Sequence, residues 1–356
     1  MRRQARGEWR AARSLRAFLS PVACRLSPAS VAVALVAGIA IVFPLVYGGQ
    51  SYLMSVATLI LIYGLVAVTL NLLIGYGGQV SLGHAGLLAV GSYTAAILAN
   101  DVALPFPLEL LAAAVATALV GLALGLPTGR LRGHYLAIAT LGFGLAVPQI
   151  ANNLSGLTGG FEGLTVPAAA IGGLTFATPV QFYYLVLLVV ALSLLAIISL
   201  LGTSTGRSFM AVRDSEAAAL AMGINTRRTK VVLFTTSAFF CGLAGDLYAH
   251  QVGVVAPSSF PFALSLIFLA MVIVGGLASV WGSLAGALVL QIVQEVTSGL
   301  GGLSSALIGA AVVLVLLLTP EGLAALPRHL RRVTHGRRPI AEAEREPASR
   351  EVSSGT

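Results

Sequence analysis

The sequence predicts an all-α, polytopic membrane protein with about ten transmembrane helices, some broken at glycines, and both termini in the cytoplasm. Only 10% of the 356 residues are charged, against about 25% in an ordinary soluble domain. Hydrophobic residues make up 57% of the chain, and the mean hydropathy is +0.92. So few charges cannot cover the surface of a soluble protein of this size, so lipid must be the solvent for most of the chain. The uncharged stretches are 26–100, 163–206, 251–294 and 296–320.

Apolar runs, separated by glycine, proline and polar breaks, give the candidate spans. Each run is close to the ~20 residues that cross a hydrocarbon core. The third is the least regular because it contains several glycines, and only the short break 278–282 separates the eighth from the ninth. In order, the spans are 31–48, 52–74, 78–100, 108–129, 134–151, 179–202, 231–250, 262–280, 283–298 and 303–320.

The distribution of charge predicts the orientation of these spans. If they alternate from an inside amino terminus, all 21 Lys and Arg residues fall in cytoplasmic segments, as the positive-inside rule requires. The chain then divides into a basic cytoplasmic segment 1–30, a transmembrane domain 31–320 and a cytoplasmic tail 321–356 that we expect to be disordered. The basic segment either only sets topology or forms a short helix on the membrane surface. Arginine at span edges accounts for the net charge of +8, so we expect no nucleic-acid partner.

Enzymatic functions lack the necessary motifs. The sequence has no GxxxxGK[ST] phosphate loop and no HExxH or other metal-ligand spacing among its five histidines. Gly202–Gly206 matches GxSxG by letter but follows a membrane span instead of a strand, so a nucleophile elbow is not expected. Cys24 and Cys241 form no disulfide framework or zinc motif. We therefore expect a non-catalytic chain with no cofactor or metal, which leaves transport, signalling or scaffolding.

The inside loop 203–230 is the only long cytoplasmic segment between spans. Asp214 or Ser215 can cap a helix there, and Glu216 favours its first turn through the helix dipole. The alanine-rich run that follows has high helix propensity, and Gly223 supplies a left-handed stop. The sequence thus predicts a helix of about two turns, which needs a partner protein or the membrane domain to pack on. An ordinary connecting helix remains the alternative.

Four polar residues lie in otherwise apolar surroundings near the glycines of the second and third spans: Asn71, Gln79, Ser81 and His84. Polar groups at membrane depth must find partners and often line a path for a polar solute. The alternative is hydrogen bonding between helices that glycine lets pack closely. The glycine pattern of 77–86 is echoed at 275–286, as in transporters built from repeats, although chance also explains it.

The few acidic residues near the spans bear on whether an ion gradient drives transport. Asp246 and Glu295 are expected near the outer interface, and Asp246 is placed to hydrogen-bond His250 four residues later. The spans otherwise look bare of carboxylates, which argues against a carrier driven by an ion gradient. The outside loop 152–178 is polar, rich in glycine and large enough to meet another molecule.

Several motifs, in order, resemble the LivM-type permease subunit of bacterial branched-chain amino-acid ABC importers. The resemblance covers about residues 52–320 and is looser after Cys241; the segments 1–25 and 329–356 lie outside it. The Ser-Leu-Gly-His version at 81–84 favours branched-chain amino acids as the solute; the alternative is urea, short amides or another small polar solute, which related permeases carry. The matching segments are GYGGQVSLGHAG at 75–86, GSYTAA at 91–96, RGHYLAIATLGFG at 132–144, NNLSGLTGG at 152–160 and the loop 206–224.

This resemblance implies a location in the bacterial inner membrane and a set of partners. They are a second, LivH-type permease subunit, two ATP-binding subunits that carry ATP and Mg, and an extracytoplasmic solute-binding protein. The loop helix corresponds to the coupling helix, although Glu216 precedes Gly223 by seven residues where six are commoner. The implied coupling positions are Arg207, Arg213, Asp214, Glu216 and Gly223, and the candidate contacts to the binding protein are Asn152, Asn153, Thr158, Gly159 and Gly160.

Overall fold

The computed structural model describes residues 28–102, 104–128, 134–297 and 309. The chain divides into two units between Gln50 and Ser51. In the first unit, α2 spans Pro28–Tyr47 and covers the first candidate span. The part of α2 whose side chains are described, Gly38–Tyr47, is apolar. The candidate span 303–320, apart from residue 309, the tail 321–356 and residues 1–27 lie outside the described residues.

The second unit is a bundle of long apolar helices. Among the described residues, eight helices are long and apolar enough to cross a membrane. They correspond to the second to ninth candidate spans, and the chain is a helical, multi-pass membrane protein. The helices are α3 (Ser51–Asn71), α4 (His84–Ile97), α5 (Phe106–Thr128), α6 (His134–Asn153), α8 (Pro179–Gly202), α11 (Thr226–Val252), α12 (Phe262–Gly275) and α13 (Val280–Thr297).

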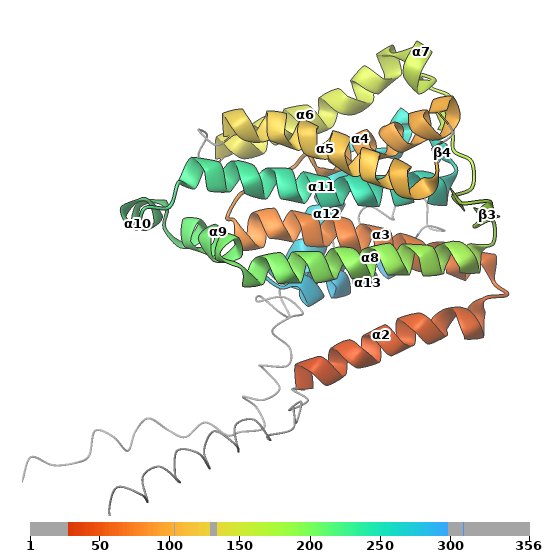
Figure 1. Ribbon diagram of the computed structural model, residues 1–356, viewed down its shortest axis with the longest axis horizontal. Helices are drawn as coiled ribbons and strands as arrows, with labels where there is room; N and C mark the ends of the chain where they lie inside the picture. Colours follow the sequence, from red (N-terminus) through yellow and green to blue (C-terminus); the bar gives the residue numbers. More distant parts are fainter. Residues whose placement is uncertain (1–27, 103, 129–133, 298–308, 310–356) are drawn as a thin grey trace, which may run out of the picture. The chain divides into compact units, whose positions relative to one another are not determined.

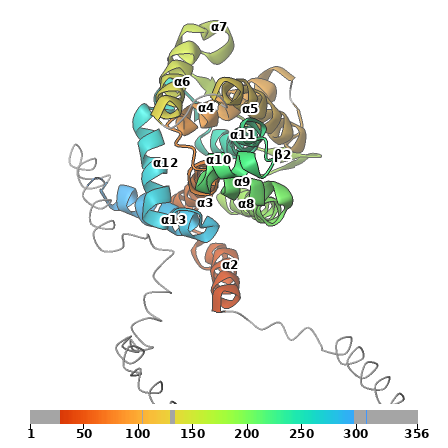
Figure 2. The same cartoon turned by 90° about the vertical axis from the view of Figure 1, so that its left-hand side faces the viewer.

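Figure 2 looks along this bundle and shows α3 and α11 near its centre, with the other long helices around them. Within its most apolar window α11 is 78% buried, whereas α6 is only 22% buried. The outer helices present large apolar side chains outward; Leu188, Leu192 and Leu195 of α8 are 57%, 57% and 61% exposed. Such a surface is stable where lipid covers it, because apolar patches of this extent are rare on soluble monomers.

Short elements lie at the two ends of the bundle (Figure 1). At one end, α8 leads into α9 (Ser204–Asp214) and α10 (Glu216–Ala221). The other end carries α7 (Ser155–Thr158), the 3₁₀ turn η3 (Pro257–Ser259) and two antiparallel strand pairs. The pairs are a small departure from the all-α prediction: β1 (Leu164–Thr165) with β4 (Val254–Val255), and β2 (Ala170–Ile171) with β3 (Leu174–Thr175).

Glycine allows α4 and α11 to pack with their backbones close together. A Cβ added to Gly91 on α4 would lie 2.8 Å from the carbonyl oxygen of Gly242 on α11. A Cβ on Gly245 would lie 2.6 Å from the carbonyl oxygen of Leu88. No larger side chain fits either place without moving a helix, which is the usual role of small residues between membrane helices.

The prediction of a third span beginning at residue 78 is wrong, because α4 begins only at His84. Gly78 takes φ +65°, which ends the preceding π-helical turn η1 (Leu72–Tyr76), and the chain stays irregular to Gly83. Irregular backbone at this depth needs protein partners, and the amide of Leu82 donates to the Thr140 hydroxyl at 3.0 Å. A second π-helical turn, η2 (Leu98–Val102), extends the far end of α4.

Candidate functional site

Asn71 joins two helix breaks that lie far apart in the sequence. It ends α3, and its side chain reaches the irregular segment between α12 and α13. The amide nitrogen donates to the carbonyl oxygens of Gly276 (3.3 Å) and Ser279 (3.0 Å) and to the Ser283 hydroxyl (2.6 Å). The amide oxygen accepts from the backbone N–H of Ala278 at 2.9 Å. This one buried side chain therefore connects the end of α3 to the later of the two glycine-rich segments, 275–286.

His84 lies at the start of α4 in a chain of buried hydroxyl groups. Its Nε2 is 3.2 Å from the hydroxyl of Ser237 on α11, and its Nδ1 is 3.3 Å from that of Ser81. Ser237 donates its own proton to the carbonyl oxygen of Thr69 at 2.8 Å. Ser237 must then accept from Nε2–H, which leaves Nδ1 to accept from Ser81, so a neutral ring satisfies every partner.

All four polar residues near the glycines are buried: Asn71, Ser81 and His84 are at most 1% exposed, and Gln79 is 4% exposed. Three of them hydrogen-bond to neighbouring groups within this chain, as the helix-packing alternative predicts. The Gln79 side-chain nitrogen has no hydrogen-bond partner within the described part of the chain. A path role for these residues thus stays a prediction, with Gln79 its best-placed member.

The loop between α8 and α11 contains two helices, where the sequence predicts only one. The predicted short helix is α10, capped by Ser215, whose hydroxyl accepts from the amide of Ala218 at 3.2 Å, and followed by Gly223 at φ +81°. The unpredicted helix is α9, whose Phe209 and Val212 are buried. A sequence signal for α9 exists: Phe209 and Val212 are three residues apart on one helix face, and the Thr203 hydroxyl caps the helix by accepting from the amide of Gly206.

Charged groups connect this loop to the bundle. Arg213 donates to the carbonyl oxygen of Gly75 in η1 at 2.8 Å and pairs with Asp214 at 2.8 Å. Glu216 on α10 accepts from Lys230 on α11, with both carboxylate oxygens 2.9 Å from Nζ. Arg207 is exposed and donates to the carbonyl oxygen of Gly202 at 3.1 Å, within its own segment.

Two large apolar side chains at the end of α10 are not covered by the described part of the chain. Met222 is 82% exposed and Leu220 is 52% exposed, at the same end of the bundle as Arg213 and Glu216 (Figure 1). An exposed methionine beside a leucine on a short helix is a typical protein-docking surface, because methionine adapts its shape to a partner.

The loop after α6 folds around two of its predicted contact residues. Thr158 is buried and donates to the carbonyl oxygens of Ala151 and Leu154, and Gly160 is buried at φ +59°. Gly159 takes φ +71° and packs on the backbone of the following turn. Thr158 and Gly160 therefore shape the loop, and of the five predicted contacts only Asn153 is exposed. The surface itself is formed by Leu154, Leu157 and Phe161, which are 50%, 52% and 83% exposed.

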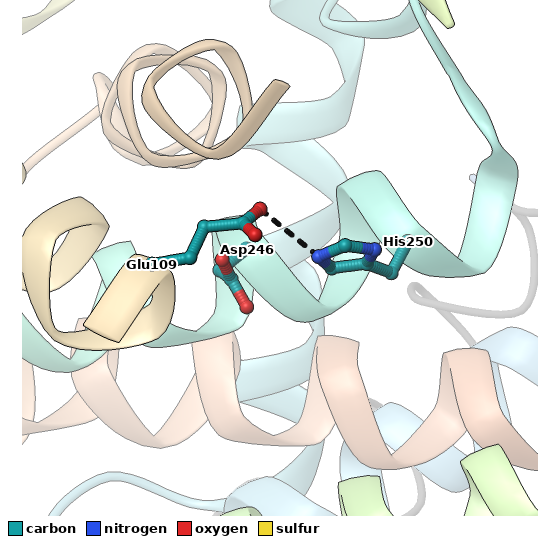
Figure 3. A group of neighbouring side chains, drawn as sticks. All are labelled: Glu109, Asp246 and His250. Carbon is teal, nitrogen blue, oxygen red and sulfur yellow. Dashed lines mark hydrogen bonds and ion pairs between the residues drawn. The ribbon is translucent and has the colours of Figure 1, made fainter. Parts of the chain in front are cut away.

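A buried group of ionisable side chains contradicts the expectation that the spans are bare of carboxylates. Glu109 on α5 and Asp246 on α11 are 2% and 0% exposed. The hydrogen bond that the spacing allows between Asp246 and His250 does not form; His250 Nε2 lies 3.0 Å from Glu109 Oε1 instead (Figure 3). Asp246 and His250 are four residues apart on α11, but no local sequence signal adds Glu109, which is 141 residues from His250.

The fold and these contacts define a multi-pass membrane protein with a structured loop at one end. Comparison with known proteins places it in a family. Residues 52–318 match the family described as branched-chain amino acid transport system / permease component, and the chain belongs to that family.

Named relatives agree with this assignment. The chain is 36% identical over 306 residues to the high-affinity branched-chain amino acid transport system permease protein LivM of Escherichia coli K12, covering 79% of this chain and 72% of that protein. It is 35% identical over 314 residues to LivM of Salmonella typhimurium, covering 82% and 73%. The permease protein BraD of Pseudomonas aeruginosa is 23% identical over 284 residues, covering 74% and 92%. No solved structure was found to match the chain.

Proposed function

We propose that this chain is a permease subunit of an ATP-driven importer of branched-chain amino acids in the bacterial inner membrane. It is non-catalytic; ATP and Mg bind to two separate ATP-binding subunits. A second, LivH-type permease completes the translocation path, and an extracytoplasmic binding protein delivers the solute. About ten spans with both termini in the cytoplasm satisfy the positive-inside rule, with α9 and α10 on the cytoplasmic side.

The observation that carries this proposal is the α9–α10 loop. It presents Leu220 and Met222 outward, and Arg213 and Glu216 fasten it to η1 and α11. A force applied to α10 by an ATP-binding subunit therefore reaches the helix break at Gly75 through a direct hydrogen bond. From there Asn71 connects α3 to the break between α12 and α13. Such contiguous contacts between segments that can change conformation are a physical requirement for coupling.

A test of the coupling role replaces Met222 with Glu. This side chain is 82% exposed, so the substitution costs the fold little, but it puts a charge into the docking surface. We expect the chain to purify normally while its association with the ATP-binding subunits and ATP-driven leucine uptake fall at least tenfold. Met222→Leu keeps an apolar contact and should retain both activities. Normal uptake by Met222→Glu contradicts the assigned docking face.

A second candidate function is an ion-coupled carrier, which the buried carboxylates Glu109 and Asp246 favour. Uptake into proteoliposomes separates the two. An ATP-driven importer takes up leucine only with its ATP-binding subunits and ATP, and ionophores leave uptake unchanged. Uptake by this chain alone, driven by a sodium or proton gradient, would establish the carrier. Competition with isoleucine, valine, urea and short amides then tests the solute class.

A further inference from the structure

The group formed by Glu109, Asp246 and His250 lies at the end of α11 opposite the α9–α10 loop. One ligand atom from each residue can be chosen so that all three lie within 4.8 Å of one another. The side chains of Glu109 and His250 are 3% and 2% exposed, and Asp246 is 0% exposed. Figure 3 shows the Glu109 carboxylate extending from α5 toward the ring of His250, with Asp246 beside them. Three ionisable groups thus share one buried site.

The hydrogen bonds of His250 require a proton or a metal cation between its ring and the carboxylate of Glu109. Its Nδ1 lies 2.9 Å from the carbonyl oxygen of Pro167. That oxygen can only accept, so Nδ1 carries the hydrogen. In a neutral ring, Nε2 is then a lone pair, and it faces a carboxylate oxygen of Glu109 at 3.0 Å. Two acceptors do not approach so closely unless a proton or a metal cation lies between them.

The carboxylate of Asp246 favours a metal cation over a proton as the group between His250 and Glu109. Both of its carboxylate oxygens are buried and have no hydrogen-bond partner among the described residues. If a proton occupies Nε2, the group holds one cation and two carboxylates, and an uncompensated buried charge is costly. Protonating Asp246 as well removes that charge but leaves its O–H without an acceptor. A divalent cation neutralises both carboxylates and gives Asp246 a partner.

We infer that Glu109, Asp246 and His250 bind one divalent transition-metal ion, for which Zn²⁺ is the best match. One imidazole nitrogen and two carboxylate oxygens are usual zinc ligands. The carbonyl of Pro167 has the role of the outer partner that fixes the tautomer of a metal-bound histidine. The rings of Phe106 and Phe182, centred 5.4 Å and 6.5 Å from that of His250, provide an apolar surround.

A bound ion has a structural consequence. A cavity of about 190 Å³, lined by His250, Gln251, Ser55, Thr58 and Thr178 among others, adjoins the site. Once bound, the metal joins α5 to α11 and, through the Pro167 carbonyl, holds the segment between β1 and β2 against them. It would therefore stabilise this end of the bundle and the adjoining loop, whichever solute the protein carries.

The test uses the full chain, without a polyhistidine tag, treated with chelator and reconstituted in lipid nanodiscs. Titration with Zn²⁺ is expected to show one bound ion per chain and to raise the thermal unfolding midpoint, whereas Mg²⁺ at the same concentration does not. Asp246→Asn, Glu109→Gln and His250→Gln should each weaken Zn²⁺ binding by at least ~10–100-fold, the loss typical of even an outer partner. Glu162→Gln removes an exposed acid from the same end of the protein and should bind Zn²⁺ like the wild type.

Two results would overturn the inference. One is the absence of a saturable Zn²⁺ site in the wild type, together with a thermal unfolding midpoint of Asp246→Asn above that of the wild type. A protonated Asp246 carboxyl predicts this result. The other is Zn²⁺ binding that all three substitutions leave intact. If the variants do not fold, X-ray absorption of the Zn²⁺-loaded wild type decides: one imidazole with oxygen ligands supports the site, and sulfur or several imidazoles exclude it.

Discussion

Replacing Asn71 with Leu should detach α3 from the break between α12 and α13. The two side chains have similar volumes, so the change removes hydrogen bonds without opening a large cavity. Asn71 has four partners, but an amide carries two hydrogens, so at most two donated bonds and the accepted bond from Ala278 form together. Hydrogen bonds between membrane helices average about 0.6 kcal/mol each, so the expected loss is about 2 kcal/mol.

The measurement is the free energy of unfolding in bicelles by steric trapping. Thr94→Val is the control, because among the described residues the Thr94 hydroxyl bonds only to the Val90 carbonyl of its own helix, at 2.7 Å. That variant should lose less than about 0.5 kcal/mol, like most substitutions away from a shared network. A double-mutant cycle of Asn71→Leu with Ser283→Ala should show a coupling of about 0.6 kcal/mol. If Asn71→Leu is as stable as Thr94→Val, the bridge between the two breaks has no energetic role.

Three further predictions concern other parts of the molecule. Glu216→Lys should reduce ATP-driven uptake by separating α10 from α11, and adding Lys230→Glu should restore it because the pair at 2.9 Å is re-formed; uptake that the double variant fails to restore would refute the pairing. Gly245→Val should abolish folded protein, because a Cβ at this position would lie 2.6 Å from a backbone oxygen of α4. Gly142→Val is the control and should express normally, because Gly142 has open space around it. Size-exclusion profiles of the two variants make the comparison. Phe161→Asp should weaken capture of the solute-binding protein without lowering the unfolding midpoint, because its ring is 83% exposed; unchanged affinity in a binding assay would remove this loop from the interface.

The sequence predicts those features that depend on neighbouring residues alone. Long uncharged runs locate the membrane helices, since each residue contributes separately to the transfer free energy of its segment. The cap at Ser215 and the stop at Gly223 are equally local, and the structure confirms both for α10. The predicted start of the third span is wrong, for a reason that the local sequence does not contain. Uncharged residues continue through 78–83, but Gly78 leaves the helical region and Thr140 of another helix hydrogen-bonds the backbone of Leu82.

Tertiary structure alone decides which polar groups meet. Asn71 contacts a segment more than 200 residues later, and α9 buries Phe209 only because neighbouring helices cover it. Glu109 and His250 approach to 3.0 Å although nothing in their local sequence connects them. Hydropathy adds up along the chain, so the sequence by itself determines the membrane class and the helices, and its charge distribution predicts their orientation. Hydrogen bonds and ion pairs depend on helix rotation and close packing at glycines, which only the assembled bundle fixes.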